Sequence, residues 1–114
     1  KWNATIVLKS ARTIIGTSDG SVWYNMSGND GMATPGTGDV LTGMIAAISC
    51  QSISLVEAVR TAVFLHGLAG DLAAEDTGRD GITATTLMDY IPSALQEFRN
   101  NPSAYCHYRI TLLP

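Results

Sequence analysis

The residues with the clearest chemical potential are Gly36, Thr37, Gly38 and Asp39, which run directly into an apolar stretch. That stretch, residues 40–48, predicts a helix, and a helix start presents unpaired backbone N–H groups and the positive end of the helix dipole. Glycine lets the backbone approach an anion without a Cβ atom in the way. The four residues are therefore predicted to form an anion hole, a cradle of backbone amides for a phosphoryl group.

Asp39 would lie in the first turn of this helix, at the mouth of the anion hole. A carboxylate there can accept the proton of a hydroxyl group while the hydroxyl oxygen attacks phosphorus. An aspartate in a first helical turn is also ordinary N-terminal capping, and glycines mark many turns. These four residues alone therefore leave both phosphoryl transfer and simple helix capping open.

The part of the chain before this segment is predicted to be rich in β-structure. Residues 4–9 predict a buried strand, and residues 13–17 and 22–25 are rich in β-branched and aromatic side chains. Asp19-Gly20 between the last two is among the most favourable hairpin turns, so these two strands should pair.

The remainder of the chain predicts three helices, at residues 38–50, 55–75 and 84–98. The first is apolar nearly all round and is expected to be central and buried. Ser54 begins a capping box at the start of the second helix, and Thr83 is the predicted N-cap of the third.

Further expectations concern the faces and ends of these helices. Leu55 is expected to share the inner face of the second helix with five other residues. These are Val59, Ala62, His66, Ala69 and Ala73. Gly67 and Gly70 indicate close packing against another element, because glycine otherwise weakens a helix. Pro92 lacks an amide hydrogen and should break the third helix or begin a new turn.

Composition excludes several classes of function. The 114 residues carry a net charge of −3 without a cluster of Lys or Arg, so neither nucleic acid nor an anionic membrane surface is an expected partner. The apolar runs fall short of the ~20 residues of a spanning helix. Cys50 and Cys106 are expected to be free thiols in a reducing, cytoplasmic compartment, and two Cys with two His do not form a zinc site. His66 is expected to be a satisfied core histidine.

The wider segment from Gly28 to Gly43 resembles the signature of the NAD(P)H-hydrate dehydratase family, a branch of the ribokinase-like small-molecule kinases. Other segments resemble the family in the same order, and together they cover about residues 4–98. These segments are residues 7–13, 65–71, 81–84 and 91–95. Ser10 and Pro35 depart from the family pattern, which has glycine at the first position and glycine or another small residue at the second.

The resemblance implies an α/β fold, namely the carboxy-terminal part of a three-layer α/β/α ribokinase-like domain. Residues 1–101 would be the carboxy-terminal half of the dehydratase domain, and residues 102–114 would be an unassigned tail. The predicted strand that begins so close to residue 1 also favours the carboxy-terminal piece of a longer domain. The family's amino-terminal half supplies much of the sheet and part of the substrate pocket.

The resemblance also implies a specific activity, the repair of hydrated NADH and NADPH. A nucleotide, ADP rather than ATP by expectation, phosphorylates the hydroxyl group of the hydrate, and phosphate then leaves. Asp39 would bind and deprotonate the substrate hydroxyl. The nucleotide would be held by Gly38 and by a loop near the start of the chain, which consists of Lys9, Ser10, Ala11, Arg12 and Thr13. Mg²⁺ would accompany the phosphates, a homo-oligomer (a tetramer in the family) is expected, and a fused or separate epimerase is a further partner.

Two alternatives differ from this dehydratase. Another ribokinase-like kinase, acting on a thiazole alcohol or a pyridoxal-type vitamin, would share the anion hole and Asp39. The segment from Asn29 to Ala33 favours the dehydratase. An inactive half-domain that binds nucleotide weakly, or only packs against a partner, is the other alternative.

Overall fold

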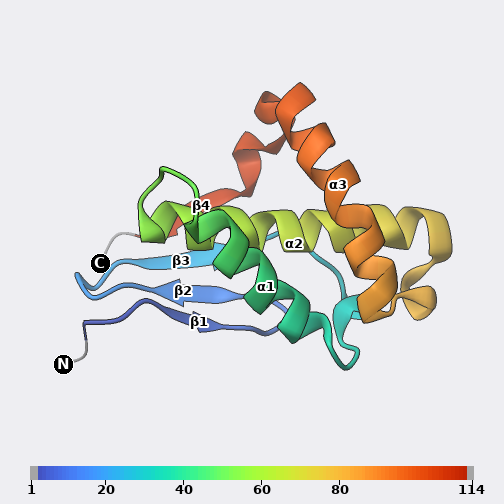
Figure 1. Ribbon diagram of the computed structural model, residues 1–114, viewed down its shortest axis with the longest axis horizontal. Helices are drawn as coiled ribbons and strands as arrows, with labels where there is room; N and C mark the ends of the chain where they lie inside the picture. Colours follow the sequence, from blue (N-terminus) through green and yellow to red (C-terminus); the bar gives the residue numbers. More distant parts are fainter. Residues whose placement is uncertain (1–2, 113–114) are drawn as a thin grey trace.

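A four-stranded antiparallel sheet and three long helices make up the structure, a computed structural model that describes the backbone of residues 3–112 and the side chains of residues 3–105 (Figure 1). The strands, in their order across the sheet, are β1 (Ile6–Leu8), β2 (Ile14–Gly16), β3 (Val22–Asn25) and β4 (Arg109–Leu112). The helices are α1 (Thr37–Ser49), α2 (Leu55–Thr77) and α3 (Ala84–Asn100), and three short 3₁₀ segments are η1 (Asp30–Met32), η2 (Arg79–Gly81) and η3 (Pro102–Tyr108). The predicted strands and helices are all present.

The predicted hairpin between β2 and β3 is confirmed, with Ile15 opposite Trp23. Its turn is closed by the Asp19 carboxylate, which accepts from the backbone N–H of Ser21 at 2.9 Å and from the hydroxyl of Thr17. The backbone after α3 returns to this hairpin, because β4 pairs with β3. Sequence reasoning left residues 102–114 unassigned, so it missed this fourth strand.

One face of the sheet packs against α1 and α2, as the side-chain register requires. Val7, Ile15 and Trp23 lie opposite one another across three strands and contact the apolar residues of the two helices. The alternate residues of β1, Ile6 and Leu8, are 56% and 61% exposed. Residues 4–9 were expected to form a buried strand, and this was wrong: Thr5 and Val7 are half-buried and the other residues are exposed, because β1 is an edge strand and the helices cover a single side. The chain itself thus supplies one sheet layer and one helical layer.

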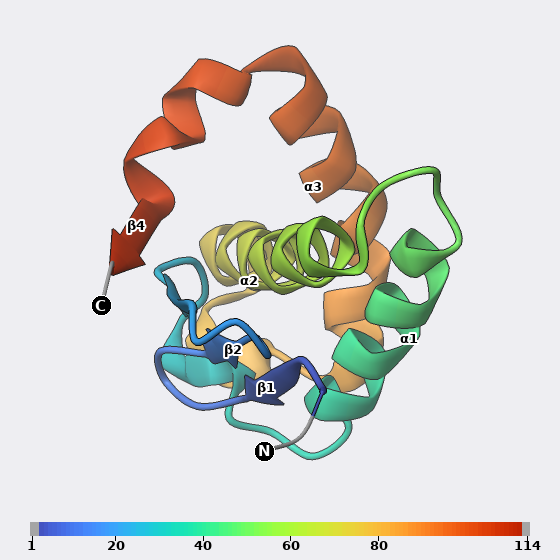
Figure 2. The same cartoon turned by 90° about the vertical axis from the view of Figure 1, so that its left-hand side faces the viewer.

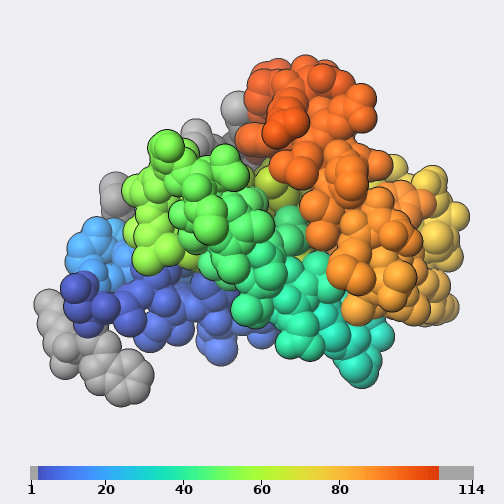
Figure 3. Space-filling view, in the orientation of Figure 1, coloured from blue at the N-terminus to red at the C-terminus, as the bar shows by residue number. Residues whose placement is uncertain are grey.

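The central helix is α2, which contacts both α1 and α3 and lies between them and the strands β3 and β4, while α1 also packs on the sheet (Figure 2). In the space-filling view α1 and α3 form the surface and hide most of α2 (Figure 3). The expectation that residues 38–50 form the central buried helix was therefore wrong. Leu41 and Met44 are buried, whereas Gly43, Ala46 and Ala47 are exposed. An apolar pattern made partly of small residues does not require burial on every side.

Both glycines of α2 allow close packing, as predicted. A Cβ atom at Gly67 would overlap Ser27, and one at Gly70 would overlap the side chain of Met32. Ser27 and Met32 belong to the loop between β3 and α1, so this loop lies directly on α2. Because Gly67 and Gly70 have no side chains, the loop between β3 and α1 can pack directly against α2.

The predicted caps of α2 and α3 are present, but two other expectations about these helices were wrong. The Ser54 hydroxyl accepts from the N–H of Glu57 at 3.2 Å, and the Thr83 hydroxyl accepts from that of Thr86 at 3.1 Å, so both predicted caps are confirmed. Leu55, expected on the inner face, is 57% exposed because it begins α2 beyond the part that the core covers. Pro92 does not break α3; it lies exposed inside the helix, where water can compensate for the missing N–H.

Two further expectations can be compared with the structure. Cys50 is a free, exposed thiol, whereas Cys106 lies outside the described side chains. Among residues 3–112, no helix is long and apolar enough to cross a membrane.

Candidate functional site

The candidate site lies where the carboxyl ends of β1 and β3 approach the first turn of α1 (Figure 1). A loop of residues 26–36 joins β3 to α1, and residues 9–13 join β1 to β2. Both loops begin at the same end of the sheet, because β1 and β3 each pair antiparallel with the strand between them. The two segments expected to bind nucleotide and phosphate thus begin at one end of the fold.

The start of α1 has the backbone geometry of an anion-binding nest. Gly36 is the N-cap residue and has a φ of 89°, in the left-handed region, and the helix follows immediately in the right-handed region. A left-handed residue followed by a right-handed one turns successive N–H groups toward one concave side. A side chain at Gly36 would be strained and would also press on Ala84 at the start of α3. Residue 36 must therefore be glycine for the nest to form.

The hydrogen bonds at this turn define which amides are available. Within the described part of the chain, the N–H groups of Gly36 and Gly38 have no hydrogen-bond partner. The Thr37 N–H makes only a long contact of 3.5 Å with the carbonyl of Thr34, and the Asp39 N–H donates to the carbonyl of Gly36 at 3.1 Å. Of the residues predicted to form the anion hole, 36–38 therefore have N–H groups that are free or only weakly bonded, whereas the N–H of Asp39 is used within the helix.

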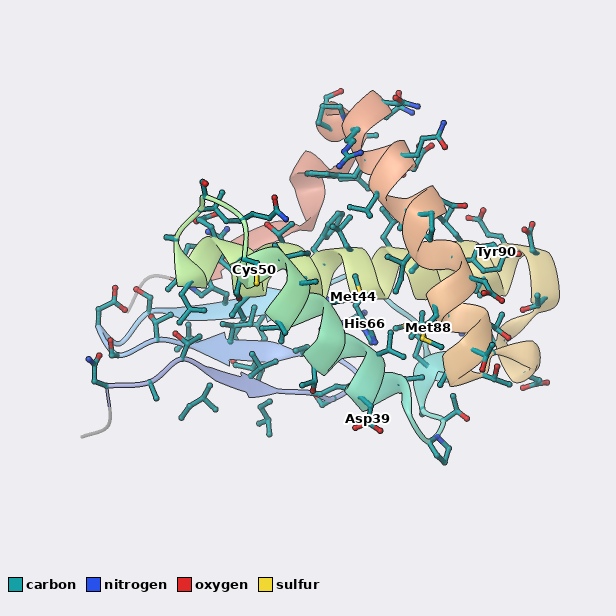
Figure 4. All side chains as sticks on the ribbon, in the orientation of Figure 1. Asp39, Met44, Cys50, His66, Met88 and Tyr90 are labelled. Carbon is teal, nitrogen blue, oxygen red and sulfur yellow. The ribbon has the colours of Figure 1, made fainter. Side chains whose placement is uncertain are left out.

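Asp39 leaves its carboxylate, rather than its amide, available to a ligand. It lies in the first turn of α1, is exposed, and projects away from the protein interior (Figure 4). Unpaired amides beside an accessible carboxylate can hold a phosphoryl group and accept a proton from an attacking hydroxyl. The exposed position leaves this carboxylate accessible to a substrate.

Lys9 is the residue of the 9–13 loop that the structure brings to the nest. A Cβ atom at Gly38 would lie 3.9 Å from Cδ of Lys9, so the lysine side chain lies beside the first turn of α1. Its ammonium group adds positive charge to an end of the helix that is already favourable for anions. The nest and Lys9 therefore combine backbone donors with an exposed cationic side chain.

The other residues expected to bind nucleotide have different environments. Ser10, Ala11 and Arg12 are exposed, and the Ser10 hydroxyl donates to the carbonyl of Arg12 at 2.8 Å, which narrows the loop. Thr13 is buried, and its carbonyl accepts from the N–H of Asn25 at 2.9 Å. Thr13 therefore extends the sheet, whereas residues 10–12 form the accessible part of the loop.

Two buried side chains, those of Thr37 and His66, stabilise the first turn of α1 through hydrogen bonds to backbone carbonyl groups. The buried Thr37 hydroxyl lies 2.9 Å from the carbonyl oxygen of Met32 and 3.0 Å from that of Thr34. His66 of α2 is 4% exposed, and its Nε2 lies 2.8 Å from the carbonyl oxygen of Thr37. Burial lowers the pKa of His66, the bond to Thr37 opposes this, and the charge of Lys9 lowers it further. The expectation of a satisfied core histidine is confirmed.

Asp71 of α2 anchors the loop between β3 and α1 through hydrogen bonds, a function that the sequence analysis did not assign to it. Its carboxylate accepts from the N–H of Gly28 at 2.8 Å and from Nδ2 of Asn29 at 3.0 Å. The Asn29 side chain also accepts from the N–H of Gly31 and donates to the carbonyl of Gly70. The only sequence signal was the location of Asp71 directly after Gly70, on the face of α2 that permits close packing.

Replacing Asp71 with alanine should destabilise the protein by about 1.5–3 kcal/mol, because a half-buried charged acceptor is removed and two donors lose their partner. Urea denaturation of the Asp71→Ala variant measures this loss. Glu75→Ala is the matched control, one turn further along α2 and exposed, and should change the unfolding free energy by less than about 0.5 kcal/mol. Equal effects in the two variants would show that Asp71 does not hold the loop.

The described side chains contain no group of three or more His, Cys, Asp or Glu residues placed to hold a metal ion. Mg²⁺ binds through one or two carboxylates, phosphate oxygens and water rather than through an all-protein cage. Asp39 is the carboxylate at the nest. The residues present are therefore compatible with a Mg²⁺ ion that arrives with nucleotide phosphates.

Comparison with known proteins relates this geometry to characterised relatives. The family described as NAD(P)H-hydrate dehydratase matches residues 1–93. A bifunctional NAD(P)H-hydrate repair enzyme of Thermofilum pendens is 52% identical over 115 residues, covering 100% of this chain and 22% of that protein. The ADP-dependent (S)-NAD(P)H-hydrate dehydratase of Bacillus subtilis is 39% identical, covering 82% of this chain and 34% of that protein.

The solved structures agree with the sequence comparison. A crystal structure of the ADP/ATP-dependent NAD(P)H-hydrate dehydratase from Bacillus subtilis, co-crystallised with ATP and Mg²⁺, superposes with a TM-score of 0.80 at 38% identity. The match covers 83% of this chain and 34% of that one. The chain thus spans between about a fifth and a third of the length of these relatives.

Proposed function

Because this chain belongs to the NAD(P)H-hydrate dehydratase family, we propose that it acts in the nucleotide-dependent dehydration of hydrated NADH and NADPH. Residues 1–101 would serve as the carboxy-terminal half of a ribokinase-like dehydratase domain. The observation that supports this most strongly is the pair of amides at Gly36 and Gly38, which have no partner among the residues that the structure describes, beside the accessible carboxylate of Asp39. This arrangement suits transfer of a phosphoryl group to a hydroxyl.

In the proposed reaction, Asp39 accepts the proton of the hydroxyl group that hydration has added to the nicotinamide ring. The hydroxyl oxygen then bonds to the terminal phosphorus of the nucleotide, and the bond from that phosphorus to the rest of the nucleotide breaks. With ADP the products of this step are AMP and the phosphorylated hydrate. Loss of phosphate from the ring, with a proton from the adjacent carbon, restores the reduced nicotinamide.

The residues of the first turn have separate functions in this scheme. The N–H groups of residues 36–38 bind the transferred phosphoryl oxygens, and residues 9–13 with Gly38 hold the nucleotide. Mg²⁺ held by the phosphates would neutralise their charge, with Asp39 as the carboxylate in the same helical turn. ADP is favoured over ATP because curated relatives are named ADP-dependent, although the crystallised relative is named ADP/ATP-dependent.

Two further aspects of the proposal concern partners and location. Relatives named bifunctional repair enzymes favour a second activity, an epimerase, fused to the dehydratase or acting beside it. A homo-oligomer in the cytoplasm completes the proposal, and size-exclusion chromatography with light scattering would measure its size.

The test uses the natural polypeptide that contains these 114 residues, incubated with hydrated NADH, ADP and Mg²⁺. We expect the absorbance of reduced nicotinamide to return while AMP and inorganic phosphate form in equal amounts. Accumulation of a phosphorylated product without elimination would indicate a kinase instead. Absence of turnover together with absence of ADP binding in calorimetry would indicate an inactive half-domain.

A further inference from the structure

His66 is the buried polar residue that connects α2 to the anion-binding nest. Its Nε2 lies 2.8 Å from the carbonyl oxygen of Thr37, and the ring is 4% exposed. A carbonyl oxygen can only accept a hydrogen bond, so Nε2 must carry the proton. Burial disfavours the charged ring. The neutral tautomer with Nε2–H is therefore the form that fits this site.

The bond to Thr37 has a direct consequence for the next residue. The carbonyl of Thr37 and the N–H of Gly38 belong to the same peptide unit, which is planar and trans. When His66 fixes the carbonyl toward the interior, the Gly38 N–H must point the opposite way, out of the core. This N–H and that of the N-cap residue Gly36 have no partner within the described residues.

We propose that His66 is a positioning residue of the phosphate site, which fixes the Thr37–Gly38 peptide so that the Gly38 N–H points at the bound phosphoryl group. Donation to the carbonyl also polarises the peptide and strengthens the N–H as a donor. Lys9, the charged group near His66, lies on the same side of the helix start as the anion and supports its binding. This inference rests on the proposed phosphate-binding function of the nest.

The test follows the Gly38 amide signal in nitrogen–proton NMR spectra while inorganic phosphate is added to the natural polypeptide. In the unaltered protein we expect the Gly38 signal to shift on addition of phosphate, and the His66 ring nitrogens to report a proton on Nε2. His66→Leu fills the space without a donor and should raise the Kd for phosphate about tenfold. His66→Gln restores an N–H near the same place and should recover most of the affinity.

Val63→Ala is the matched control, because Val63 is equally buried on α2 but packs toward the sheet. It should lose stability while it keeps phosphate affinity. If Val63→Ala loses as much affinity as His66→Leu, or if His66→Leu binds phosphate normally, the positioning function is refuted. If the unaltered protein shows no shift at Gly38, the proposed phosphate site itself fails, which is a distinguishable result.

Discussion

Asp39→Asn should lower turnover by about 10²–10⁴-fold, the usual loss when a general base is removed. The amide has nearly the same shape as the carboxylate but cannot accept the hydroxyl proton. The nest consists of backbone N–H groups, and the N–H of residue 39 donates within the helix, so nucleotide should bind with unchanged affinity. Steady-state kinetics and nucleotide calorimetry on the same preparation separate the two effects.

Asp89→Asn provides the control for Asp39→Asn, since Asp89 is also exposed and lies on α3. It should keep normal turnover. Loss of an acidic residue from the first turn of α1 should change stability by less than about 1 kcal/mol. Near-normal turnover in Asp39→Asn would mean that Asp39 only stabilises the helix end, and the proposed chemistry would then be wrong.

Gly38→Val should weaken the binding of nucleotide phosphate by about 10²-fold without unfolding the protein. Residue 38 is exposed and its φ is not positive, so a branched side chain fits the helix itself. The added Cβ would lie in ordinary contact with Lys9, and its methyl groups would extend over the unpartnered N–H. Calorimetric titration with ADP measures the loss.

Gly43→Val is the matched control for Gly38→Val. Gly43 lies on the same helix, is exposed, and has open space where a side chain would be added. The variant should fold, gain a few tenths of a kcal/mol in stability from the higher helix propensity of valine, and bind ADP normally. Equal ADP affinity in both valine variants would place the phosphate somewhere other than the start of α1.

Local sequence patterns predicted the elements of this fold well. Asp19-Gly20 fixed the hairpin through its turn geometry, and the hydroxyls of Ser54 and Thr83 cap the helices as expected. These features depend on residues a few positions apart, so a sequence contains all the information that they require. The glycine-rich start of α1 belongs to the same class, which is why the candidate site was visible in the sequence.

Features that depend on tertiary contacts could not be predicted in the same way. The bond from His66 to Thr37 and the bonds from Asp71 to residues 28 and 29 join segments far apart in the chain. The exposure of Gly43, Ala46 and Ala47 depends on what covers α1, which hydrophobic periodicity does not specify. The hydrogen bond from the Asp39 N–H to the carbonyl of Gly36, which occupies one of the four amides proposed to bind the anion, likewise became visible only in the structure.

The central claim is that this site transfers a phosphoryl group to the hydroxyl of the hydrate before elimination. The most direct measurement labels that hydroxyl with a heavy oxygen isotope and follows the label by mass spectrometry after turnover with ADP. Phosphorylation makes the labelled oxygen the bridge between carbon and phosphorus, so the account predicts the label in the inorganic phosphate. Recovery of the label in water instead would show direct dehydration, and would contradict the function proposed for Asp39 and the nest.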